Sequence, residues 1–317
     1  MKYNWQLKDW PNFSYKPAEI NDLIIDAVQE ISLITGGIKD STEQNQIDTI
    51  IGIMLSEAIK SSEIEGEILK REDVYSSVRK HFGLKPLINV KNDKADAISQ
   101  IMVDAYQTFA KPLSHKQLNA WHQVLFQERS NIVVGNYRKH QEPMQVVSGH
   151  FGKVKIYFEA PPSTILKHEM QEFIKWFNNT APGKAHEIKA APLRAAMAHL
   201  YFESIHPYED GNGRIGRIIA EKALSQTMGY PLLICLSQEI ESKKKLYYSS
   251  LEKAQSSNEI TAWLQYFLTM LIAATKRTDK LLNFVLSKSR FYSKHQDDLN
   301  LRQAKLIKRM LDEGSDG

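Results

Sequence analysis

Most of this 317-residue chain carries apolar residues at helical spacing, with polar residues between them. Over residues 47–60, apolar positions recur at intervals of three and four, as they do on one face of a helix. The same spacing predicts helices over residues 192–205 and 215–228. The first has an apolar stripe that includes Leu200, and Gly229 ends the second.

One short segment has the period of a strand instead. Val154, Ile156 and Phe158 alternate with Lys155 and Tyr157, so that apolar side chains would face one side of a sheet. The pattern therefore predicts a mainly α protein with one small β-hairpin.

The layout suggests three parts. Residues 1–84 form an N-terminal helical region, and the polar residues 85–96 form a connection. A helical core follows over residues 97–276. Residues 277–317 form a C-terminal helical segment, within which residues 300–311 have an apolar stripe of their own.

Composition narrows the class of protein. The formal charge of +4, from 41 basic and 37 acidic residues, does not by itself favour nucleic-acid binding. The single cysteine, Cys235, lies in an apolar run, which indicates a packing role, excludes an internal disulfide and fits a reducing compartment. No basic and apolar leader opens the chain, and no apolar stretch approaches the ~20 residues of a membrane span. We therefore expect a cytoplasmic protein.

Residues 206–217 read His-Pro-Tyr-Glu-Asp-Gly-Asn-Gly-Arg-Ile-Gly-Arg and lie between two predicted helices. The loop would thus end at a helix N-terminus, whose free N–H groups bind anions. Gly211 and Gly213 permit positive φ and let backbone N–H groups approach phosphate oxygens closely. Asn212 can adopt the left-handed region or donate its side-chain amide.

The charged residues of this loop suit phosphate chemistry. Arg214 and Arg217 are three apart on a helix, so they can bind neighbouring phosphates. Asp210 suits Mg²⁺, which takes one or two carboxylates together with phosphate oxygens. His206 titrates near neutrality and can accept a proton from a hydroxyl. Any one of these residues is more often structural, but together they indicate transfer of a phosphorus-centred group to a hydroxyl.

This string resembles the signature of the Fic (filamentation induced by cAMP) family, His-Pro-Phe-x-Asp/Glu-Gly-Asn-Gly-Arg-x-x-Arg, with Tyr208 in place of Phe. Most members transfer AMP from Mg-ATP to a Ser, Thr or Tyr hydroxyl of a protein and release pyrophosphate. The resemblance implies the helical Fic core, with His206 as general base. Kinase-type members have Lys where this chain has Gly213, so glycine favours attack on the α-phosphate.

The resemblance also implies a nucleotide site. Asp210 would hold Mg²⁺, and Arg217 would hold the γ-phosphate. On the adenine side, Gln255 stands where several members have Asn. The implied nucleotide-binding residues are Asp210, Gly211, Asn212, Gly213, Arg214, Gly216, Arg217, Tyr247, Tyr248 and Gln255.

Residues 135–138, the strand segment and Pro161-Pro162 resemble the β-hairpin flap of the family. By that resemblance, the flap edge would hold a target segment in extended form through main-chain hydrogen bonds. The residues of this edge are Val154, Lys155, Ile156 and Tyr157. An ordinary surface hairpin is the alternative.

The predicted helix over residues 47–60 runs into Ser61-Ser-Glu-Ile-Glu-Gly66, which resembles the inhibitory motif of Fic proteins. Ser61 and Glu65 are four apart and share a face, and Gly66 suits a helix C-terminus. The resemblance implies that Glu65 pairs with Arg217 in place of the γ-phosphate, since carboxylate and phosphate both form two parallel bonds to guanidinium. Alternatively, Glu65 is one of several exposed acids, with Glu57, Glu63 and Glu67.

Partners follow less directly. Self-modification is the only candidate target, and family members often dimerise, so a homodimer is expected. Some members also remove AMP. Residues 300–311 resemble the first helix of a winged-helix module, and nucleic acid would be a partner only if that module is complete.

Two other functions stay open. A non-catalytic nucleotide-sensing or DNA-linked regulator would use the loop for binding alone, but binding needs no base such as His206. A metal-dependent phosphohydrolase would use His199, His206 and Asp210.

Overall fold

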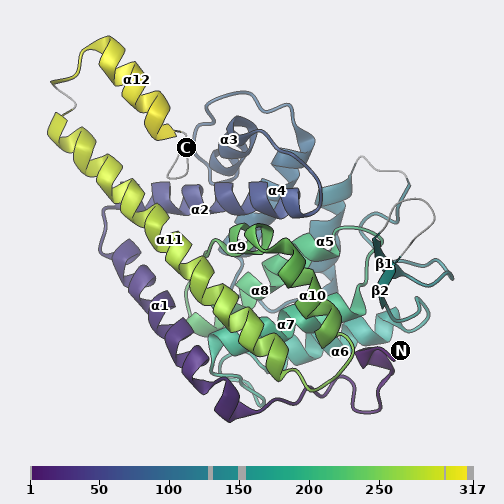
Figure 1. Cartoon of the computed structure of the whole chain (residues 1–317). Coiled ribbons are helices and arrows are strands. Elements are labelled where there is room, and N and C mark those ends of the chain that lie inside the picture. The colour runs from purple at the N-terminus through teal and green to yellow at the C-terminus, as the bar shows by residue number, and fades with distance from the viewer. Residues whose placement is uncertain (1, 128–130, 149–154, 296–297, 313–317) are drawn as a thin grey trace.

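The computed structural model describes residues 2–127, 131–148, 155–295 and 298–312, and it is mainly helical (Figure 1). The predicted mainly α fold with a small β-hairpin is confirmed. The elements are η1 (Asn4–Gln6), η2 (Pro17–Glu19), α1 (Asn21–Lys39), α2 (Glu43–Ile64), α3 (Arg71–His81), α4 (Asp93–Gln107), α5 (His115–Phe126), β1 (Gln145–Ser148), β2 (Lys155–Glu159), α6 (Leu166–Asn179), α7 (Ala191–Ile205), α8 (Asn212–Met228), α9 (Leu236–Ser242), α10 (Lys244–Ala254), α11 (Thr261–His295) and α12 (Leu301–Asp312).

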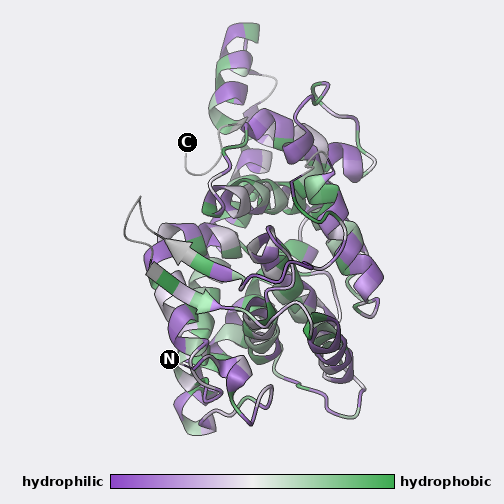
Figure 2. Cartoon of the chain, turned by 90° about the vertical axis from the view of Figure 1, so that its right-hand side faces the viewer, coloured by the Kyte–Doolittle hydropathy of each residue, from purple (hydrophilic) through white to green (hydrophobic). Residues whose placement is uncertain are grey.

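Helix α7 forms the centre of the core and packs against α8, α11, α6 and α1. Figure 2 shows hydrophobic residues concentrated on the helices in the middle of the molecule. Every residue of α7 is buried, so the prediction of one apolar stripe was too narrow. Ala195, Ala196 and Ala198 are small enough to let neighbouring helices approach from the remaining sides.

Two helices are longer than the sequence pattern predicts. Helix α8 begins at Asn212, three residues earlier than expected, because Gly211 in the left-handed conformation (φ 83°) precedes its first turn. Gly229, also left-handed, ends it as predicted. Helix α2 extends to Ile64, and Thr42 caps its N-terminus by accepting a hydrogen bond from the Asn45 N–H.

The polar connection is shorter than expected. Helix α4 already begins at Asp93, where Asn92 caps it by accepting a hydrogen bond from Ala95 N. The predicted connection therefore forms the first turn of a helix that packs on α3 and α5.

The C-terminal part is one long helix followed by a short one. Helix α11 passes through residue 276 without interruption. Helix α12 projects from the rest of the molecule (Figure 1), and three residues of its apolar stripe are exposed, Leu301 at 92%, Leu306 at 61% and Met310 at 64%. Among the described residues, no helix combines the length and apolar character needed to cross a bilayer.

Candidate active site

The loop between α7 and α8 begins at His206. The backbone N–H of this residue donates to Phe202 O and ends α7, and the residue adopts the left-handed conformation (φ 50°, ψ 60°). Within the described residues, it is the one non-glycine residue with positive φ. Such a conformation costs about 1–3 kcal/mol and persists only where its surroundings impose it.

Arg138 imposes part of this conformation. Its guanidinium is buried and donates from Nε to His206 O at 3.0 Å and from Nη2 to Pro161 O. Its backbone N–H donates to Pro207 O at 3.0 Å. One side chain thus joins the loop to the segment that follows β2. The sequence placed Arg138 only in the flap pattern and did not indicate this role.

Asn212 and Tyr208 close the loop internally. The Asn212 side chain accepts from Tyr208 N at 2.9 Å and donates to Tyr208 O at 2.8 Å, so its amide is held in one orientation by the loop. The Tyr208 ring stacks on His122 with a centroid distance of 4.1 Å, and its hydroxyl donates to Asn119 Oδ1. The tyrosine therefore anchors the loop, as expected for an aromatic at this position.

The His206 imidazole is largely buried. Burial, followed by the positive charge of Arg138, lowers the pKa of this imidazole to about 4, so the ring is neutral at pH 7. A neutral imidazole can accept a proton, as a general base must.

Glu203, one turn earlier on α7, lies close to this ring, with Oε2 3.8 Å from His206 Nδ1. Burial raises the pKa of the Glu203 carboxyl to about 8, so it is mostly protonated at pH 7. A Cβ at Gly216 would collide with this carboxyl, which explains the glycine there. Sequence reasoning missed Glu203, although its i, i+3 spacing from His206 was a signal.

Arg217 is buried and fully engaged by the end of α2. Its Nη2 donates to Glu65 Oε1 and to Ser61 O, each at 2.9 Å, and its Nε donates to Ser61 Oγ at 3.0 Å. Gly66 follows in the left-handed conformation (φ 80°), and Gly66 N donates to Glu63 O, so the helix ends where the sequence predicted. The structure thus brings Ser61, Glu65 and Arg217 together.

Gly213 does not use the positive φ that glycine permits, but its missing Cβ matters as expected. It lies in the first turn of α8 and does not have positive φ. A Cβ at this position would overlap the Glu65 carboxylate. The absent side chain therefore makes room for an anion.

A second carboxylate occupies the other arginine. Arg214 Nη1 donates to Glu67 Oε2 at 2.8 Å, and Lys94 Nζ donates to Glu67 Oε1 at 2.9 Å. The view of Glu67 as an exposed acid is therefore wrong. It is wrong for Glu57 as well, because that side chain is buried and accepts hydrogen bonds from the N–H groups that begin α9. Glu63 does pair at the surface, with Lys60.

Asp210 is the candidate magnesium ligand. Its side chain is 37% exposed, and Oδ1 accepts from Gly211 N at 2.6 Å. One such carboxylate fits Mg²⁺ that arrives with phosphate oxygens. In the part of the chain that the structure describes, no three His, Cys, Asp or Glu side chains form a metal-binding group. His199 instead bonds the Tyr247 hydroxyl at 2.8 Å, which argues against the phosphohydrolase.

The predicted adenine side comes from α10. The Tyr247 ring is buried and meets the Tyr248 ring at 5.1 Å. Gln255 lies just after the helix, is buried, and donates from Nε2 to Glu203 O at 3.1 Å. Its amide therefore serves the protein's own packing around α7.

The predicted hairpin is present, with β1 antiparallel to β2. The register pairs Val146 with Phe158 and Val147 with Ile156, so Tyr157 is the extra residue of a bulge. The bulge breaks the predicted alternation, because Phe158 is buried whereas Ile156 is 45% exposed. Lys155 belongs to β2, and Val154 lies outside the described residues.

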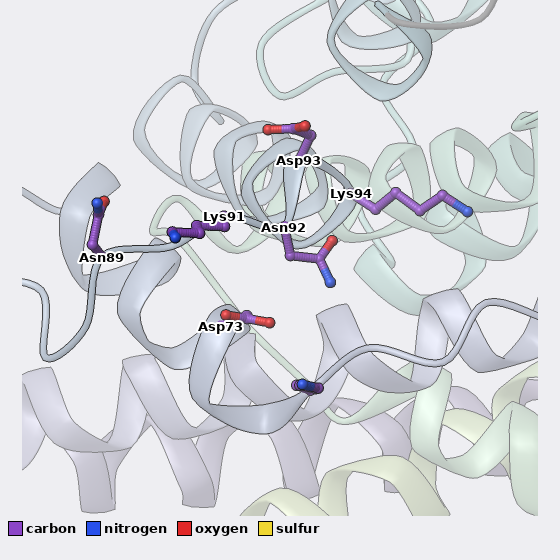
Figure 3. A pocket seen from close by; sticks show the side chains of 7 residues that line it. Asp73, Asn89, Lys91, Asn92, Asp93 and Lys94 are labelled. Carbon is purple, nitrogen blue, oxygen red and sulfur yellow. The ribbon is translucent and has the colours of Figure 1, made fainter.

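A shallow hollow of about 560 Å³ lies near the starts of α3 and α4. Figure 3 shows Lys94 extending away from Asp73 and Lys91. The lining residues, Lys70, Asp73, Asn89, Lys91, Asn92, Asp93 and Lys94, carry both signs of charge. Such a surface selects neither anions nor cations, so the loop is the better candidate site.

Comparison with known proteins supports the loop as the candidate site. Residues 112–224 match the Fic/DOC family, and residues 3–84 match a domain of unknown function (DUF4172). Over 142 residues, 44% of this chain, identity is 30% to the protein adenylyltransferase Fic of Aedes aegypti and 28% to that of Drosophila melanogaster. The chain spans about a quarter of the length of these relatives, 25% and 26% respectively.

Solved structures share the fold. A Fic family protein from Desulfovibrio desulfuricans G20 superposes with a TM-score of 0.62 at 22% identity, covering 84% of this chain and 75% of that one. A Fic domain containing signaling protein from Bacteroides thetaiotaomicron gives 0.59 at 19% identity, covering 80% and 97%. Residues 112–224 therefore match the Fic/DOC family, and the chain shares the fold of these Fic proteins.

Proposed function

We propose that this protein transfers AMP from ATP to a hydroxyl group of a protein, releases pyrophosphate, and is restrained by Glu65. One observation carries the proposal. A neutral, largely buried imidazole lies beside a helix N-terminus, and both arginines of that helix start are bound by carboxylates where phosphates would otherwise bind. Relatives named protein adenylyltransferase support the reaction type.

The chemistry follows from the residues. The acceptor hydroxyl gives its proton to His206, and its oxygen attacks the α-phosphorus. The bond from that phosphorus to the bridging oxygen of the β-phosphate breaks, and pyrophosphate leaves with the electron pair. Arg214, Arg217 and the free N–H groups at the start of α8 stabilise the phosphate charge. Mg²⁺, with Asp210 among its ligands, would neutralise part of the charge on the triphosphate.

Restraint by Glu65 follows from the same contacts. Its carboxylate accepts a hydrogen bond from Arg217 Nη2 and fills the space above Gly213. A γ-phosphate needs that guanidinium, so the two anions compete for one site. Removal of the carboxylate should let ATP bind with its phosphates extended along the loop.

The test uses ATP labelled at the α-phosphate with three proteins: the unmodified chain, Glu65→Gly, and Glu65→Gly combined with His206→Ala. We expect the Glu65→Gly variant to label protein faster than the unmodified chain. Loss of the base should then reduce labelling by roughly 10²–10⁴-fold. The acceptors supplied are the chain itself and a whole-cell protein extract.

Other outcomes would overturn the proposal in distinct ways. Nucleotide binding without protein labelling would support the regulator. Free labelled AMP as the sole product would support a hydrolase. Protein labelling that persists in the His206→Ala variant would show that His206 is not the general base.

A further inference from the structure

Residues 3–6, which we call the strap, contact both the end of α7 and the end of β2. Figures 1 and 2 both place the N-terminal segment beside the two strands of the hairpin. The segment belongs to the part of the chain that matches a domain of unknown function.

Asn4 joins the strap to the helix that carries His206. It is fully buried, and its Nδ2 donates to Ser204 Oγ at 2.8 Å, two residues before His206. Its backbone N–H donates to Gln255 O at 2.8 Å, and its Oδ1 accepts from Trp5 N at 2.8 Å. A buried amide satisfied in this way is held in one orientation.

Trp5 and Tyr3 join the strap to the flap. The Trp5 indole Nε1 donates to Glu159 O at 2.7 Å, at the end of β2. The Tyr3 ring meets the buried Phe158 ring of β2 edge to face, with centroids 5.1 Å apart. The strap therefore contacts the catalytic helix through one residue and the flap strand through its two neighbours.

We propose that Asn4 and Trp5 are positioning residues that fix the flap strand β2 relative to His206, so that a protein acceptor on the flap lies within reach of that base. This inference rests on the proposed function. Displacement of a reacting group by about 1 Å can cost a rate factor of ~10². The strap thus gives the N-terminal region a positive role in acceptor use, in addition to the Glu65 contact.

The test is Trp5→Phe in the Glu65→Gly protein, which keeps an aromatic ring and removes the indole N–H. Trp10→Phe is the matched control, because Trp10 Nε1 also donates a hydrogen bond, at 2.8 Å, but to Glu169 of α6. Four quantities are measured: label transferred to protein, labelled AMP released to water, affinity for ATP, and amide exchange over residues 155–159. A second variant, Tyr3→Leu, removes the ring contact with Phe158.

We expect Trp5→Phe to lower protein labelling about tenfold relative to Trp10→Phe, with AMP release and ATP affinity unchanged. Amides 155–159 should exchange faster in Trp5→Phe and Tyr3→Leu only. Equal effects of the two tryptophan variants on labelling and exchange would overturn the inference, as would a parallel loss of ATP binding. If the Glu65→Gly protein shows no labelling of protein that depends on His206, the proposed function fails. Amide exchange tests the strap independently, because unchanged exchange over residues 155–159 in Trp5→Phe would refute its positioning role even then.

Discussion

The active-site loop, residues 206–213, and the covering segment, residues 65–67, meet at the same arginines but are built differently. Buried contacts fix the loop, from the Arg138 guanidinium to the two bonds between Asn212 and Tyr208. The covering segment is held mainly by ion pairs, of Glu65 with Arg217 and of Glu67 with Arg214 and Lys94. Its glutamate side chains are 24% and 12% exposed, and Ile68, the next residue, is 90% exposed.

This difference indicates which of the two parts moves. Breaking a buried ion pair is costly when it leaves one charge without a partner. Under the proposed function, a triphosphate would avoid that cost, because its phosphates would bind the same guanidiniums as the glutamates leave them. The loop would stay in place during the exchange, since its contacts do not depend on which anion is bound.

The largest expected effect is on the free energy of unfolding, and it appears when alanine replaces either of two glycines that share one backbone conformation. Gly211 in the loop has φ +83°, and a Cβ there would lie 2.6 Å from Phe126 Cε2, whereas Gly66 has φ +80° and open space around it. Gly211→Ala should therefore cost about 2–5 kcal/mol of unfolding free energy, from backbone strain and overpacking together. Gly66→Ala should cost about 1–2 kcal/mol from backbone strain alone.

Urea unfolding of both variants measures this difference. The loop variant should also lose transfer activity, because Phe126 and the turn must shift. Equal urea midpoints for the two variants would mean that the loop accommodates an added methyl group as easily as the covering segment does.

The second prediction concerns a carboxyl group beside the loop that burial keeps mostly neutral at pH 7. The Glu203 carboxyl has a pKa near 8 in the folded protein against 4.5 ordinarily, so the folded state holds a proton that the unfolded state releases. Its contribution to stability is present below pH 4.5 and is lost as pH rises towards 8. Glu203→Gln removes this dependence, so the variant should gain up to a few kcal/mol relative to the unmodified chain between pH 5 and 8.

Unfolding free energies at pH 5, 6.5 and 8 provide the measurement. Other groups with raised pKa, such as Glu57, are present in both proteins and cancel in the difference. Parallel pH curves would show that Glu203 is charged in the folded protein.

The third prediction separates the two carboxylates of the covering segment. Glu67→Gln should raise protein labelling about fivefold, because it frees Arg214 from a charge-assisted bond worth about 1 kcal/mol net in this partly exposed setting. Glu65→Gly should raise it more, since Glu65 also fills the space above Gly213. Glu63→Gln is the control, because Glu63 pairs with Lys60 at the surface and should change nothing.

Initial rates of α-labelled AMP incorporation in the single and double variants test this order. A gain for Glu63→Gln equal to that for Glu67→Gln would point to loosening of the helix end and would exclude specific release of Arg214.

Local features of the site could be predicted from the sequence. The spacing within residues 206–217 correctly predicted a loop at a helix start, and Gly66 correctly marked the end of α2. These predictions depend on neighbours within a few residues, where the backbone fixes geometry.

Contacts between distant residues could not be predicted. Arg138 and His206 are 68 positions apart, and Glu67 and Arg214 are 147 apart. Periodicity does not encode such pairs. The full burial of α7 was missed for a related reason, because a stripe indicates one buried face but cannot show that other helices cover the opposite face.

The smallest expected effect is that of Tyr208→Phe, which restores the usual residue of the Fic signature. The ring should remain stacked on His122, since the stacking at 4.1 Å involves no hydroxyl. The variant loses the bond from the hydroxyl to Asn119 Oδ1, and partial access to water lets Asn119 find another partner. We expect a loss of about 0.5–1 kcal/mol in unfolding free energy and unchanged labelling in the Glu65→Gly background. A tenfold fall in labelling at unchanged stability would instead place the hydroxyl in the reaction, and the loop could then no longer be regarded as a rigid support whose aromatic anchor acts through packing alone.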